Sequence, residues 1–136
     1  MGGMTPKASD RAARAAALRL SALLIGAGVT HFAAPRPFDS IVPRSLPGEA
    51  RTYTYVSGAA EIAVGTALAV PRTRRLGGTL AAALFVAVFP ANAQMTVDWL
   101  RSSRRSPIEK VLVVARLPVQ IPLVTQALAA RRGPRD

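Results

Sequence analysis

Four long apolar segments, separated by short polar connections, constrain the fold of this chain more than any other feature. The segments cover residues 15–33, 53–70, 76–97 and 111–130. Each holds roughly 18–22 residues, and at about 1.5 Å per helical residue that length crosses a hydrocarbon core of about 30 Å. Within lipid, such segments satisfy their backbone hydrogen bonds as helices. The sequence therefore predicts an all-α fold, namely an integral membrane four-helix bundle.

Prolines mark the connections between these segments. Four prolines between residues 35 and 47 keep the first connection non-helical for most of its length, with room for one short interfacial turn at Phe38. Pro71 ends the second predicted helix, and Pro107 is suited to the first turn of the fourth.

The chain is predicted to divide into a polar basic amino-terminal tail (1–14), the four-helix domain (15–130) and a basic carboxy-terminal tail (131–136). Basic residues are more frequent on the side that carries both termini, which favours a multi-pass protein of the cell membrane with both termini in the cytoplasm. Ten lie on that side: Lys7, Arg11, Arg14, Arg19, Arg72, Arg74, Arg75, Arg131, Arg132 and Arg135. Seven lie on the other: Arg36, Arg44, Arg51, Arg101, Arg104, Arg105 and Lys110.

Composition narrows the classes of function. Half of the residues are hydrophobic although the net charge is +11, and the basic residues sit at segment ends without aromatic residues interleaved. That pattern indicates a lipid bilayer as partner and argues against nucleic acid. The chain has no cysteine and one histidine, which excludes disulfides, thiolate metal sites and a thiol relay. We expect no metal and no built-in cofactor.

One polar side chain from each predicted helix falls in the same half of the bilayer: His31, Glu61, Asn92 and Arg116. A carboxylate at mid-bilayer costs roughly 2.5–3.5 kcal/mol on insertion scales, so Glu61 needs compensation from the protein. Arg116 is its predicted counter-charge, and Gln120 shares a helix face with Arg116. These five residues are the candidate polar core or ligand site, and no catalytic residue is assigned.

Two interpretations of this cluster stay open. A Glu–Arg pair can simply fix the register of two helices, with Asn and Gln side chains as further interhelical links. Alternatively, ionisable groups inside a membrane often mark a functional pocket. In that case Phe85 and Phe89, on the face of the third helix that carries Asn92, are expected to form its wall.

Several runs of sequence resemble small DoxX-like membrane proteins. The runs are Gly28-Val-Thr-His31-Phe-Ala-Ala-Pro35, Phe38-Asp-Ser-Ile41-Val-Pro43, Ser57-Gly58-Ala-Ala-Glu61 with Gly65, Phe89-Pro90-Ala-Asn92 and Arg116-Leu-Pro118-Val-Gln120. The resemblance implies a four-helix integral membrane protein associated with a quinol oxidase or another membrane redox system. Any thiol-based role of relatives does not transfer to a chain without cysteine.

The resulting expectation is an accessory or quinone-interacting subunit of a membrane redox system, with quinone as ligand. Because the chain has no redox-centre motif, it is not expected to be an enzyme on its own, and electrons would come from a membrane oxidoreductase partner. A homo-oligomer is the other partner considered. The alternatives are a structural or assembly protein without a ligand, and a minimal small-molecule or lipid carrier.

Overall fold

The structure, a computed structural model, describes residues 8–132, and these residues are almost entirely helical. The elements are α1 (Ala8–Ala33), α2 (Pro35–Asp39), α3 (Ala50–Ala69), a 3-10 turn η1 (Pro71–Thr73), α4 (Arg74–Arg101) and α5 (Pro107–Ala130). The described range contains no strand, so the predicted all-α class is confirmed. Residues 1–7 and 133–136, which belong to the two predicted tails, lie outside the described residues.

The four long helices correspond to the four apolar segments. Each begins before its segment, and α3 ends one residue before the predicted end, at Ala69. α1 begins at Ala8, inside the predicted polar tail, because this stretch is rich in alanine and carries Asp10 in the first turn, where the helix dipole favours an acid. α5 begins with Pro107 at its first position, as predicted. Ser106 and Glu109 form a capping box that satisfies amide groups at this start.

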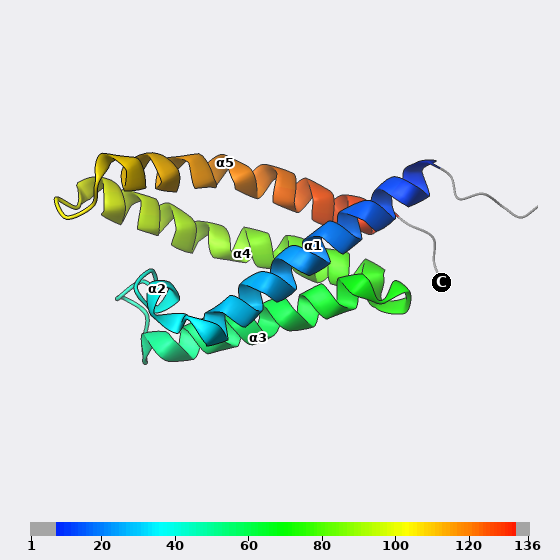
Figure 1. Cartoon of the computed structure of the whole chain (residues 1–136), viewed down its shortest axis with the longest axis horizontal. Coiled ribbons are helices and arrows are strands. Elements are labelled where there is room, and N and C mark those ends of the chain that lie inside the picture. Colours follow the sequence, from blue (N-terminus) through cyan, green and yellow to red (C-terminus); the bar gives the residue numbers. More distant parts are fainter. Residues whose placement is uncertain (1–7, 133–136) are drawn as a thin grey trace, which may run out of the picture.

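The long helices are arranged as two pairs, α1 with α3 and α4 with α5 (Figure 1). α1 crosses α3 diagonally, and the pairs lie close together at the end where α1 begins and α5 ends. At the opposite end the pairs separate, and α2 with the following loop lies near the opening (Figure 1). The two ends of the described chain therefore lie at the closed end.

The apolar core occupies this closed end. Its buried side chains come from the first half of α1, the end of α3, the start of α4 and the end of α5: Ala17, Leu20, Leu24, Val64, Leu68, Ala81, Phe85, Ala127 and Ala130. Arg74 caps the end of α3 by donating from Nε and Nη2 to the carbonyl oxygens of Leu68 and Ala69, at 2.8 and 3.0 Å. Mostly small side chains let the helices approach closely here.

Glycines bring α1 and α3 together toward the open end. A Cβ placed on Gly28 would lie 2.6 Å from the carbonyl oxygen of Gly58, and a Cβ on Gly58 would lie 2.8 Å from Cβ of His31. Both distances are shorter than van der Waals contact, so only glycine fits at this crossing without a shift. This contact places the next turn of α3, which carries Glu61, beside His31.

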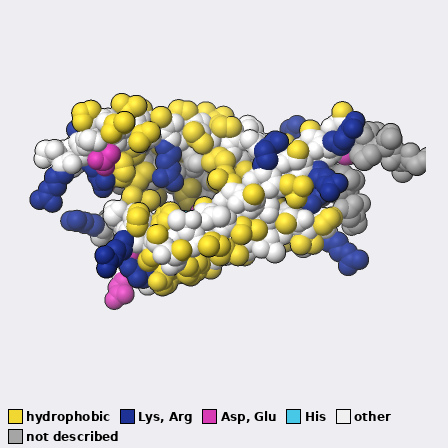
Figure 2. Space-filling view, in the orientation of Figure 1, with side chains coloured by type: hydrophobic (Ala, Val, Ile, Leu, Met, Phe, Trp, Pro, Cys, Tyr) yellow, Lys and Arg dark blue, Asp and Glu magenta, His cyan; other side chains and the backbone are white. Residues whose placement is uncertain are grey.

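Long apolar helices indicate that the chain is a membrane protein. By length and composition three can cross a bilayer: α1, the stretch Pro71–Arg101 and α5. Hydrophobic side chains cover much of the outer surface of both pairs, and Lys and Arg are most frequent toward the two ends (Figure 2). Ile121 on α5, for example, is 68% exposed. α3 is not among the three.

Candidate functional site

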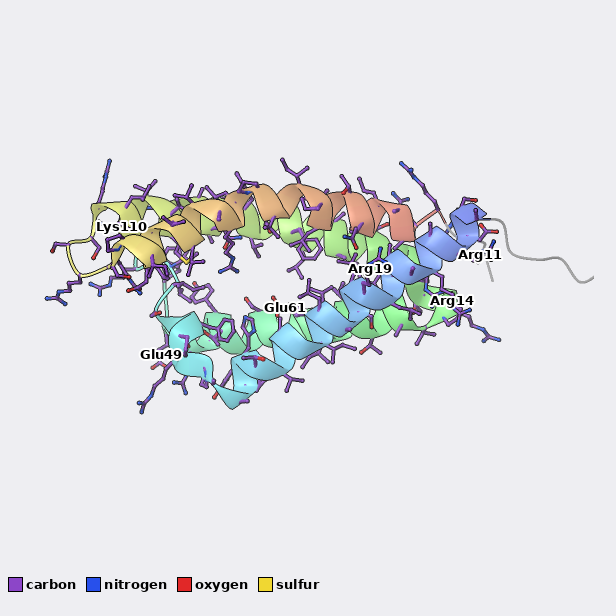
Figure 3. All side chains as sticks on the ribbon, turned by 45° about the horizontal axis from the view of Figure 1, so that its top comes forward. Arg11, Arg14, Arg19, Glu49, Glu61 and Lys110 are labelled. Atoms are coloured by element: carbon purple, nitrogen blue, oxygen red, sulfur yellow. The ribbon has the colours of Figure 1, made fainter. Side chains whose placement is uncertain are left out.

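A cavity of about 220 Å³ lies between the two helix pairs at the open end. Its lining combines polar residues from all four long helices with apolar residues of the loop after α2. The polar residues are His31, Tyr53, Thr54, Ser57, Glu61, Asn92 and Arg116, and the apolar ones include Phe38, Ile41, Val42, Leu46, Val88 and Met95. Glu61 lies midway along the molecule, where α1 passes α3 (Figure 3). Four of the five predicted site residues therefore meet around one cavity.

His31 is the ionisable residue that lies within 4 Å of Glu61 in the described range. Nδ1 of His31 lies 3.4 Å from Oε2 of Glu61, and the two side chains are 10% and 19% exposed. The same Nδ1 lies 2.6 Å from the carbonyl oxygen of Ala27, which can only accept, so Nδ1 carries a proton and donates it to Ala27. Oε2 of Glu61 is left buried without a hydrogen-bond partner among the described residues.

Asn92 and Arg116 face the same cavity from the second helix pair. Within residues 8–132 the side-chain amide of Asn92 makes no hydrogen bond, although the residue is buried. The guanidinium of Arg116 likewise makes no hydrogen bond or salt bridge to the described part of the chain. A buried polar group without a partner costs about 1–3 kcal/mol, more when charged. Among the described residues only Oε2 of Glu61 is a fully buried group of this kind. Arg116 is exposed, and the side chains of Asn92 and Arg116 can bond to a molecule inside the cavity.

The loop that contains α2 covers the cavity. The ring of Phe38 stacks on that of His31, with centroids 3.7 Å apart and planes inclined by 22°. Next to it, Asp39 accepts hydrogen bonds from Oγ1 of Thr54 at 2.6 Å and from Nε of Arg51 at 2.8 Å. The bond from Thr54, then the bond and charge of Arg51, hold the pKa of Asp39 below its ordinary value of 3.8. The carboxylate of Asp39 therefore ties α2 to α3 at neutral pH.

Arg116 is not the direct counter-charge that the sequence indicated for Glu61. The two residues line one cavity, but no salt bridge joins them in the described range, whereas His31 lies within reach of Glu61. The reason is the pairing of the helices. Gly28 and Gly58 hold α1 against α3, while α5, which carries Arg116, belongs to the other pair and is separated from α3 by the opening.

Gln120 and the two phenylalanines lie outside the cavity. Nε2 of Gln120 donates to the carbonyl oxygen of Phe85 at 2.8 Å, one turn beyond Arg116 and toward the closed end, so Gln120 links α5 to α4. Phe85 belongs to the apolar core, and Phe89 is 44% exposed. Neither of the two phenylalanines predicted as a pocket wall lines this cavity. Around the axis of α4, Val88 and Met95 lie about 60° or less to one side of Asn92, and this side faces the cavity. Phe89 lies about 60° to the other side of Asn92.

Several residues of the site were not predicted from the sequence. Thr54 and Ser57 line the cavity on the face of α3 that carries Glu61, at the helical spacing that could have identified them. Met95 lies three residues after Asn92 and gave no such signal, since a methionine in an apolar helix is ordinary. Among the described residues, no group of His, Asp and Glu side chains could hold a metal ion.

Residues 20–131 match the model of a protein family described as a domain of unknown function, DUF8561. The chain belongs to this family. The match covers α3, α4, α5 and α1 from Leu20 onward, together with every residue of the cavity, so the site lies within the family domain. No curated protein and no solved structure matches the chain. The DUF8561 match gives no link to the DoxX-like proteins.

Proposed function

We propose that this protein is a four-helix integral membrane protein of the cell membrane, with both termini in the cytoplasm and α3 as its fourth span. The 20 residues of α3 give a helix of about 30 Å, the thickness of a hydrocarbon core. α3 packs along α1 through Gly58 and Gly65, and Oγ of Ser21 donates to the carbonyl oxygen of Gly65 at 2.7 Å. Glu61 of α3 lines the cavity. A carboxylate that faces a cavity is tolerated in a membrane-spanning helix, so Glu61 does not prevent insertion of α3.

We further propose that the cavity binds a small ring that accepts hydrogen bonds, of the quinone head-group class. One observation carries this proposal: Asn92 and Arg116, whose side chains make no hydrogen bond to the described residues, line the same cavity as Glu61. The volume of about 220 Å³ is below the range of roughly 300–1,000 Å³ of pockets for drug-sized ligands, which favours a single ring. An apolar tail would extend between the helix pairs.

The chemistry of the side chains fits such a ring. Asn92 and Arg116 donate hydrogen bonds to a ring carbonyl, and Arg116 stabilises negative charge that develops there on reduction. Glu61 accepts a hydrogen bond from a ring hydroxyl and exchanges its proton. The electrons come from a partner oxidoreductase, since this chain has no redox-centre motif. The resemblance to DoxX-like proteins supports a role as an accessory subunit of such a system.

Binding of a short-chain quinone to the purified protein in lipid nanodiscs tests this proposal. Isothermal titration should give saturable binding, and Asn92→Leu and Arg116→Leu should each weaken it by about tenfold or more, because a hydrogen bond to a charged or buried group is worth about 1.5 kcal/mol. Phe89→Leu is the matched control on α4, because Phe89 lies outside the cavity. Absence of saturable binding to the unaltered protein would sink the quinone proposal.

A structural role is the second candidate, favoured by the interhelical bonds of Gln120 and Ser21. It requires that the polar cavity residues only hold the helices together. In that case replacing Glu61 and Arg116 together by leucine should restore the stability lost in either single change. Because no salt bridge joins the two residues, we expect additive losses of ligand affinity and no rescue of binding in the double variant. A carrier role is tested separately by ligand flux into liposomes with Glu61→Gln.

A further inference from the structure

A second hollow adjoins the cavity on the side of the connection between α4 and α5. Its volume is about 400 Å³, and its lining comes from the loop after α2 and from the end of α4. Four residues line both spaces: Ile41, Val42, Pro43 and Met95. The two hollows therefore meet at these four residues. Three of the four belong to the loop, and the fourth is on α4.

The loop is attached on one side only. Toward the first helix pair, Asp39 binds Arg51 and Thr54, and the hydroxyl of Tyr53 donates to the carbonyl oxygen of Pro47. Toward the second pair, no hydrogen bond or salt bridge joins residues 34–49 to α4 or α5 in the described range. The edge of the loop toward α4, where Met95 lines the same two hollows, therefore has no polar bond and is the weaker of the two edges.

Met95 is suited to move at this edge. The side chain is 6% exposed, so it fills the partition. Methionine is unbranched, has three rotatable bonds and changes rotamer at low cost. Val42, opposite it in the shared wall, is on a loop segment whose backbone bonds are local turns, such as the amide of Val42 to the carbonyl oxygen of Asp39 at 3.3 Å. A small outward movement of either residue joins the two spaces.

The outer hollow has the polarity of a membrane surface. Its lining includes Arg44, Asp98 and Arg105, and the guanidinium of Arg105 lies 3.9 Å from the centre of the Trp99 ring. Arg and Trp side chains at the end of an apolar helix are typical of the boundary between lipid and water. The hollow is thus a polar space at the surface, next to a cavity that is polar at its deeper wall.

We infer that the cavity is entered from the membrane surface, through the outer hollow and past a gate formed by Val42, Pro43 and Met95. The inference rests on the proposed function in that the cavity takes a ligand. It adds the route: the polar head group of the ligand passes the gate first, and the gate opens along α4 while the bonds of Asp39 hold the other edge of the loop on α3.

A single introduced thiol tests this route. Because the chain has no cysteine, Asn92→Cys places one thiol in the wall of the cavity. The rate of its reaction with a charged methanethiosulfonate, which enters from water and not from lipid, is measured in nanodiscs. Adding Met95→Ala should raise the rate about tenfold, and adding Val42→Trp should lower it about tenfold, which corresponds to ~1.4 kcal/mol in the opening of the gate. Phe89→Ala is the matched control on α4 and should leave the rate unchanged.

Two results would overturn the route. One is a rate that neither Met95→Ala nor Val42→Trp changes. The other is a rate that Phe89→Ala raises as much as Met95→Ala does, which would show that the effect of Met95→Ala is not specific to the gate. The two gate variants lie on different elements and act in opposite directions, so misfolding of one does not decide the result. The reagent needs no quinone, so failure of the route and failure of quinone binding are separate outcomes.

Discussion

The close contact between α1 and α3 gives the sharpest prediction, because α1 offers a matched pair of glycines. A Cβ on Gly28 would lie 2.6 Å from the carbonyl oxygen of Gly58 and 2.7 Å from Cγ1 of Ile62, whereas a Cβ on Gly26 would meet no atom within 4 Å. Both changes to alanine add the same methyl group to the same helix. They differ only in what the methyl group meets.

The structure sets the expected magnitude. To restore van der Waals contact after Gly28→Ala, α3 has to move away from α1 by roughly 1 Å. Overpacking of this kind costs about 1–3 kcal/mol, while alanine in place of a helical glycine gains roughly 0.5–1 kcal/mol at both positions. The gain cancels in the comparison, so Gly28→Ala should be less stable than Gly26→Ala by about 1–3 kcal/mol.

Reversible unfolding in mixed micelles, followed by circular dichroism as a denaturing detergent is added, measures this difference. Gly26→Ala should equal or exceed the unaltered protein in free energy of unfolding. If the two variants prove equally stable, the helices do not meet at Gly28 and Gly58, and the placement of His31 beside Glu61 loses its basis. The same shift should separate His31 from Glu61, so Gly28→Ala should also weaken quinone binding while Gly26→Ala leaves it unchanged.

Three further predictions concern the residues around the cavity. Gln120→Leu removes the bond to the carbonyl oxygen of Phe85 and should lower the free energy of unfolding by about 1 kcal/mol without changing quinone affinity, because Gln120 lies outside the cavity. Asp39→Asn should increase amide hydrogen exchange over residues 36–46 at neutral pH, and equal exchange in both proteins would contradict the attachment of α2 to α3. Because the pKa of Asp39 is lowered, its carboxylate stabilises the attachment of α2 to α3 fully above pH 3.8, and this stabilisation is lost as pH falls through the lowered pKa. At acid pH the unaltered protein should therefore show the amide exchange of Asp39→Asn.

Much of the fold was predictable because a helix in lipid is defined by length and polarity alone. Apolar segments of sufficient length, ended by prolines and charges, gave the four long helices, and counting residues from their ends gave the depth of Glu61 and Arg116. Depth is conserved when a helix rotates about its axis. The prediction that one polar residue from each helix lies at the same level therefore did not depend on how the helices face one another.

The partners within the site depend on that rotation and on the pairing of helices. Nothing in the spacing of Glu61 distinguishes His31 from Arg116 as its neighbour. The decision is made by Gly28 and Gly58, whose effect appears only when α1 is placed against α3. The stacking of Phe38 on the His31 ring could not be predicted from the sequence either, because the direction of the five-residue α2 is set only when it packs.

The division of the molecule into a packed end and an open end bears on why Glu61 is tolerated. The main apolar core cluster lies toward the packed end, and none of its residues lines the cavity. An ion pair with Arg116 would have offset the cost of the buried carboxylate, but no such salt bridge occurs in the described range. The single close neighbour, His31, directs its Nδ1 proton to Ala27. Oε2 of Glu61 is enclosed by protein atoms and has no donor among the described residues. The cavity that Glu61 lines, at about 220 Å³, has room for roughly seven waters or one small ring. A cluster that served only to hold helices together would be more stable if that space were closed, whereas a binding site requires the space to be open.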